Sequence, residues 1–123
     1  MEKQLVISFS DGEDVLAGIK EAVKQHDVDL ARFRSADGCL KDFELISDDY
    51  KDLKGVPEEH FVDKVSGRVL KQKDENYSVD LHLTLLKKVA SKTNPVSGEL
   101  RKGLASGELT FILTLSSLKS MIH

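Results

Sequence analysis

Alternating apolar and polar residues predict strands over most of the chain, and only one segment has helical spacing. Residues 5–9 alternate and predict a first strand. From 15 to 23, apolar residues recur on one face of a helix and charged residues on the other, so we expect an amphipathic helix that ends near His26. The preceding Ser10-Asp11-Gly12-Glu13 is typical of a capping box, in which the Ser10 oxygen accepts a backbone N–H and Glu13 reaches back.

After the helix the period changes to two. Strands are expected near 30–36, 39–47, 61–72, 77–87, 98–105 and 107–116. Asp37-Gly38 is a turn signal between the first two, and segments 48–59 and 89–97 are expected to be loops. One helix among six or seven strands with mostly short connections predicts an α+β fold dominated by an antiparallel sheet. At 123 residues, the chain is expected to form a single domain over 1–123.

The charge balance restricts the classes of partner. Eighteen Lys and Arg against 21 Asp and Glu give a net charge of −3, which argues against the uniformly basic surface of a strong nucleic-acid binder. The first half is acidic and the second basic, which indicates either a field that orients a partner or ordinary solvated faces. A single cysteine, Cys39, and the lack of a signal-peptide core or a long apolar span favour a soluble cytoplasmic protein that contacts no membrane.

The strand at 77–87 is the segment most suggestive of chemistry. Its alternate leucines should enter the core, which leaves Asp80, His82 and Thr84 together on the opposite face, about 7 Å apart at i, i+2 spacing. A carboxylate and an imidazole in this arrangement can bind one divalent metal if a third ligand comes from elsewhere. The same spacing is also compatible with an ordinary surface Asp–His pair.

A second group is basic. It includes five residues of the C-terminal half, Lys87, Lys88, Lys92, Arg101 and Lys102. These side chains could form a phosphate-facing patch for nucleic acid, to which Arg32 and Arg34, on one face of their strand, could contribute. Charged runs of this kind are also common on surfaces that bind nothing.

Several segments resemble, in order, the plants-and-prokaryotes-conserved (PPC) domain family. The resemblance is carried by Gly12-Glu13-Asp14-Val15-Leu16 at the helix start, Gly38, Val65-Ser66-Gly67, Leu81-His82-Leu83, Ser97-Gly98-Glu99-Leu100, Gly103 and Glu108. Each motif is short, but together they cover nearly the whole chain. The resemblance implies an α+β domain that assembles as a homotrimer.

Function is also implied by this resemblance. In plant members the domain follows AT-hook segments that bind AT-rich DNA, whereas stand-alone prokaryotic members are commonly labelled DNA-binding. No Arg-Gly-Arg-Pro hook occurs in this chain, so any contact with DNA would come from the domain surface. Some members are thought to hold a metal on clustered histidines.

The chain departs from the family at those histidines. Asp80 and Glu99 stand where the family has histidine, and His82 is kept. An Asp–His–Glu set could hold one divalent metal per subunit, with a preference shifted toward Mn²⁺ or Fe²⁺, or it could persist as a hydrogen-bonded cluster without metal.

Three kinds of function therefore remain open. The first is a non-catalytic, oligomeric binding and regulatory module, associated weakly with DNA. The second is a metal-dependent enzyme or small-molecule sensor that uses Asp80, His82 and Glu99. The third is a domain that acts through protein–protein contact. The first interpretation is preferred for three reasons: the family resemblance, the absence of a recognisable nucleophile motif, and the positive charge of the C-terminal half.

Overall fold

A computed structural model of the chain describes residues 3–47, 53–87 and 95–116. These residues form one antiparallel sheet and one helix, which confirms the predicted α+β class. The elements, in order, are β1 (Lys3–Phe9), α1 (Val15–Gln25), β2 (Leu30–Ser47), β3 (Leu53–Val56), β4 (His60–Lys71), β5 (Tyr77–Lys87) and β6 (Val96–Ser116).

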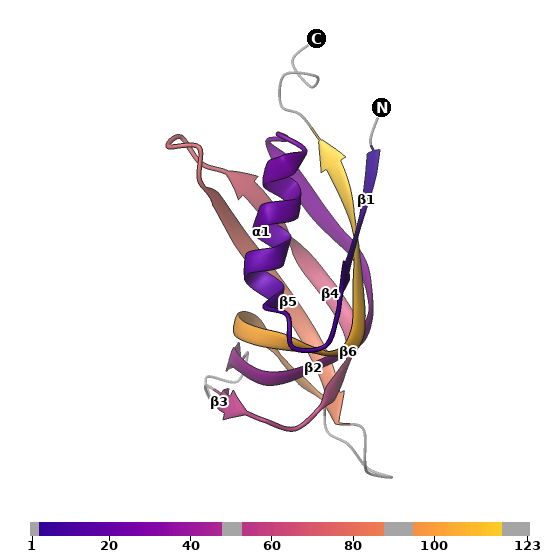
Figure 1. Cartoon of the computed structure of the whole chain (residues 1–123). Coiled ribbons are helices and arrows are strands. Elements are labelled where there is room, and N and C mark those ends of the chain that lie inside the picture. Colours follow the sequence, from indigo (N-terminus) through magenta and orange to yellow (C-terminus); the bar gives the residue numbers. More distant parts are fainter. Residues whose placement is uncertain (1–2, 48–52, 88–94, 117–123) are drawn as a thin grey trace.

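The sheet has the strand order β1-β6-β5-β4-β2-β3, and β6 also pairs with β2. Consequently β2, β4, β5 and β6 pair in a closed ring, to which β1 and β3 are added at the edges. Figure 1 shows β2 and β6 bending together and α1 lying against the sheet between β5 and β1. The sheet thus has a face that packs on the core and an outer face that points away from it.

The apolar positions of the alternating segments lie in the core, as expected of strands with one buried face. Leu81, Leu83 and Leu85 of β5 are completely buried, as their spacing predicted. The same apolar cluster includes Val15, Ile19 and Val23 of α1, which are buried and recur at helical spacing. None of the described helices is long and apolar enough to cross a membrane.

The helix begins differently from the prediction. The cap is Asp14, whose Oδ1 accepts the backbone N–H of Ala17 at 3.0 Å. Glu13 does reach back, and its Oε1 accepts the Ser10 backbone N–H at 2.6 Å. The expected role of Ser10 as the cap was therefore wrong, because a turn at Gly12 (φ +85°) separates Ser10 from the first helical residue.

Two pairs of predicted strands are each one long, bent strand. Residues 30–36 and 39–47 belong to one strand, β2, which pairs with β6 from Leu30 to Ser47. The pairing shifts register between Gly38 and Cys39, so Asp37-Gly38 forms a bulge and no hairpin turn. Likewise 98–105 and 107–116 form one strand, β6, with Gly107 at φ +65°.

The segment 48–59 was also expected to be a loop throughout. It contains a short strand, β3, in which Leu53 pairs with Leu45 of β2 and Val56 with Phe43. The side chain of His60, which follows this segment, is buried edge-on against Phe43, and its Nδ1 lies 2.9 Å from the carbonyl oxygen of Glu58. Of the second expected loop, residues 89–94 lie outside the described residues, while Val96 and Ser97 begin β6.

Candidate functional site on the outer face of the sheet

The outer face gathers the polar residues of β5 beside those of β4. Because Leu81, Leu83 and Leu85 enter the core, Asp80, His82 and Thr84 lie on the opposite face. Their cross-strand partners on β4 are Arg68, Ser66 and Lys64, respectively. Cross-strand partners project from the same face with their Cβ atoms about 5 Å apart, so the structure forms three polar pairs in a row.

On its other side, β5 pairs with β6 in the region of the predicted metal set. Glu99 is the direct partner of His82, so these two predicted residues are brought side by side. Ser97 is the partner of Thr84, and their hydroxyl oxygens are 2.8 Å apart. Both His82 and Glu99 are half-buried.

Asp80 lies two residues before His82 on the same face of β5, beyond the stretch that pairs with β6. Its side chain is exposed, and its cross-strand partner is the cation Arg68. Among residues 3–47, 53–87 and 95–116, no group of three or more His, Cys, Asp or Glu side chains is placed to hold a metal ion. In this arrangement the three side chains do not form a preassembled metal-binding set. The set of Asp80, His82 and Glu99 stays a prediction, which elemental analysis of protein purified without a histidine tag would test.

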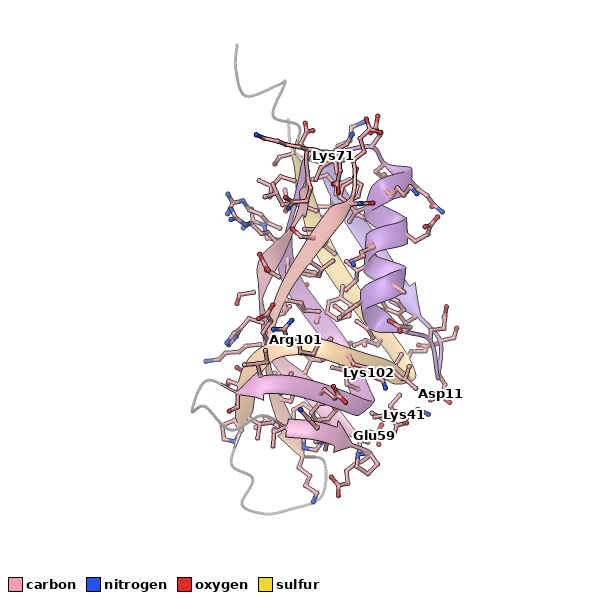
Figure 2. All side chains as sticks on the ribbon, turned by 90° about the vertical axis from the view of Figure 1, so that its left-hand side faces the viewer. Asp11, Lys41, Glu59, Lys71, Arg101 and Lys102 are labelled. Atoms are coloured by element: carbon pink, nitrogen blue, oxygen red, sulfur yellow. The ribbon has the colours of Figure 1, made fainter. Side chains whose placement is uncertain are left out.

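The predicted basic group is spread over the molecule. Lys87 lies beyond the end of the β5–β6 pairing at Leu85, and Arg101 lies beyond the other end at Glu99. Lys102 pairs with Glu44 of β2 and lies nearer to Lys41 and Asp11 than Arg101 does in Figure 2. Lys88 and Lys92 lie outside the described residues. The described members of the group therefore do not form one patch.

A different basic cluster does form on the outer face. Arg32 of β2 is the direct partner of Arg68 of β4, and Arg34 lies two residues along β2 on the same face. All three side chains are exposed. The guanidinium of Arg34 is oriented by a hydrogen bond from its Nε to Oγ1 of Thr114, at 2.8 Å. We call Arg32, Arg34 and Arg68 the arginine patch.

Sequence reasoning found only part of this patch. The period-two spacing of Arg32 and Arg34 placed both on one face, whereas Arg68 was not singled out. Its position depends on the register between β2 and β4, which are separated along the chain by β3. No local signal in the sequence specifies that register.

These features define a class of protein. The chain is an α+β domain in which a ring of antiparallel strands presents a polar, locally basic outer face. The sequence profile of the Plants and Prokaryotes Conserved (PCC) domain matches residues 1–117, and the chain belongs to this family, also abbreviated PPC. The predicted resemblance is confirmed.

Solved structures support the same fold. A plant- and prokaryote-conserved protein from Pyrococcus horikoshii is 22% identical with a TM-score of 0.69, covering 94% of this chain and 80% of that protein. A metal-containing protein from Archaeoglobus fulgidus is 20% identical with a TM-score of 0.70, covering 94% and 81%. A protein from Bacteroides thetaiotaomicron, described as a "putative DNA binding protein", is 16% identical with a TM-score of 0.76, covering 93% and 78%. No curated protein sequence matches the chain.

Proposed function

We propose that this domain is a non-catalytic, self-associating regulatory module that binds DNA weakly through the arginine patch and works in the cytoplasm. Family membership and the description of the Bacteroides protein support the class of partner. The observation that carries the proposal is the direct opposition of Arg32 and Arg68, with Arg34 beside them. Neither Arg32 nor Arg68 has an ion pair within the described part of the chain.

Arginine is suited to this task. Its planar guanidinium donates two parallel hydrogen bonds to phosphate oxygens, and it is weakly hydrated compared with an ammonium group. Phosphate contacts dominate DNA affinity, and each one releases condensed counterions. With a net charge of −3 for the whole chain, three arginines in one patch give weak, strongly salt-dependent binding.

Self-association raises this affinity. If three copies hold their patches toward one DNA duplex, the second and third contacts become intramolecular and avidity exceeds the affinity of one patch. Light scattering coupled to size exclusion tests the assembly. A homotrimer has about 41 kDa, three times the 13.7 kDa of the chain, and a mass near 13.7 kDa would contradict the oligomeric part of the proposal.

Fluorescence anisotropy with AT-rich and mixed-sequence duplexes, at about 50 and 200 mM salt, tests DNA binding itself. The informative variant is the double substitution Arg32→Gln and Arg68→Gln. The matched control is Lys20→Gln with Lys24→Gln, which removes the same charge from exposed positions on α1.

We expect the arginine variant to bind about tenfold or more weakly and the slope of log K against log salt to fall by about 2, since two phosphate contacts are removed. The lysine control should keep the affinity and the slope of the natural chain. Undetectable binding at the lower salt concentration would overturn the proposal. Equal losses in both variants would show that net charge, and not the arginine patch, governs binding.

A further inference from the structure

A small pocket opens on the outer face between β4 and β5. It has a volume of about 260 Å³, and its lining consists of Lys64, Val65, Ser66, His82 and Thr84. The polar members supply an ammonium group, two hydroxyls and an imidazole, all of which can donate hydrogen bonds. Among the described residues, no aspartate or glutamate lines this pocket.

The four polar side chains come from two adjacent cross-strand pairs. Lys64 is opposite Thr84, and Ser66 is opposite His82. The pairs are therefore at the corners of a rectangle about 5 Å across the strands and 7 Å along them. Val65, between the two β4 residues, pairs with the buried Leu83, so an apolar layer lies beneath the polar corners.

One corner is fixed by a hydrogen bond outside the pocket. The hydroxyl oxygens of Thr84 and Ser97 are 2.8 Å apart, and either can be the donor. When Ser97 donates, the Thr84 proton is available to a ligand. A hydroxyl already oriented by a neighbour loses less side-chain entropy when it binds.

We propose that this pocket binds a phosphate group, either as free inorganic phosphate or as the head group of a phosphomonoester. The donors match an oxyanion, and hydrogen bonds to a charged group are the stronger ones. A volume of about 260 Å³ lies just below the range of about 300–1,000 Å³ that encloses drug-sized ligands, so a phosphate head fits while any larger part of the molecule extends into solvent.

The neighbouring carboxylates fix where the anion lies. Asp80 and Glu99 both neighbour His82 but do not belong to the lining. Their repulsion disfavours an anion at the His82 end, so the phosphate lies toward Lys64 and Thr84. This ligand site is distinct from the arginine patch and does not rest on DNA binding.

The test is a titration of the ¹⁵N-labelled protein with inorganic phosphate, followed by amide chemical shifts at near-neutral pH and constant ionic strength. We expect saturable shifts centred on the amides of Lys64, Ser66 and Thr84. Lys64→Met should weaken binding about tenfold or more because it removes the one ammonium group that the described residues contribute to the lining. Lys73→Met, in the exposed turn between β4 and β5, is the control with the same change of charge and should bind phosphate normally.

Thr84→Val is a second variant, which preserves the shape of the side chain, and should weaken binding several-fold with an otherwise unchanged spectrum. Titration with glycerol phosphate distinguishes the two sources. Tighter binding than that of inorganic phosphate assigns the pocket to a phosphomonoester head group, and equal binding assigns it to free phosphate. The absence of saturable shifts up to about 20 mM phosphate, or equal affinity in Lys64→Met, would overturn the proposal.

Discussion

Arg32 of β2 and Arg68 of β4 are direct partners in antiparallel pairing, with both side chains exposed on the outer face of the sheet. Like charges placed directly opposite each other destabilise a strand pair. Within the described chain, neither guanidinium is neutralised by an ion pair. Asp80 of β5 is opposite Arg68 on its other side, but the Arg32–Arg68 pair is itself unfavourable, which is expected of a surface that binds an anion.

This relationship predicts that one arginine can be removed with a gain in stability. Arg32→Thr should raise the free energy of unfolding by about 0.2–1 kcal/mol, because it ends the repulsion and introduces a residue favoured in strands. Urea unfolding at low salt measures the gain. At about 1 M salt, where charges are screened beyond about 3 Å, the gain should become smaller. A lower stability than that of the natural chain at low salt would show that Arg32 has a stabilising contact.

Gly67 controls the geometry of the β4 residues in the site. It lies between Ser66 and Arg68 with φ +116°, and a Cβ added there would overlap the carbonyl oxygen of Asp80. Gly67→Ala should therefore cost about 2–4 kcal/mol of unfolding free energy, from both backbone strain and displacement of β5. Gly55 also has positive φ (+60°), but a Cβ there meets no atom of the described residues within 4 Å.

Gly55→Ala is accordingly the matched control for Gly67→Ala. Only the left-handed backbone conformation opposes it, and we expect a cost of about 1 kcal/mol. Thermal or urea unfolding of the two variants distinguishes the cost of backbone strain from the cost of overlap between the added Cβ and β5. Equal costs would mean that β5 moves away from Gly67 without penalty.

The sequence predicted the strand β5 well and the long strands β2 and β6 less well, for a physical reason. Strict alternation of apolar and polar residues is a local property, and it gave 77–87, the bounds that β5 has. The structure at Gly38 and Gly107 could not be predicted in this way. A glycine that precedes a new run of alternating residues is compatible with either a turn or a bulge. A bulge forms at these positions because β2 pairs with β6 on both sides of them. That pairing joins residues far apart in the chain.

In the candidate site, too, some residues could be placed from local spacing, whereas others depend on the register between strands. Asp80 and His82 were placed on one face from i, i+2 spacing alone. Glu99 was selected from the family resemblance, and its position opposite His82 is set by the register between β5 and β6. Arg68 and the pocket beside Lys64 depend on two further registers, β2 with β4 and β4 with β5, for which the sequence contains no local signal.

The start of α1 offers a direct comparison of the predicted and observed caps. Asp14→Ala removes the acceptor of the Ala17 N–H and should lower the unfolding free energy by about 1 kcal/mol. Ser10→Ala should change it by less than about 0.5 kcal/mol, because the bond to Glu13 uses the backbone N–H of Ser10. Urea unfolding of both variants measures the difference. A larger loss in Ser10→Ala would restore Ser10 as the cap.

The contact between Asp11 and Lys41 predicts a loss of stability in acid. The Lys41 ammonium, 2.9 Å from Oδ1 of Asp11, and the Gly107 amide that donates to the same oxygen lower the pKa of Asp11 below its usual 3.8. Since the carboxyl binds a proton more weakly in the folded than in the unfolded protein, its contribution to stability is complete above pH 3.8 and disappears as the pH falls through the folded pKa.

Asp11→Asn should therefore be less stable than the natural chain near neutral pH, and the difference should close as the solution is acidified below about pH 3.8. Asp37→Asn, at another exposed position, makes the same change of charge. We expect its stability to follow that of the natural chain, because Asp37 has no hydrogen bond or ion pair from its side chain within the described residues. Unfolding midpoints measured from neutral pH to about pH 3 test both variants. A difference between Asp11→Asn and the natural chain that stays constant through this range would show that hydrogen-bond geometry, and not the ionised carboxylate, links the turn before α1 to β2 and β6.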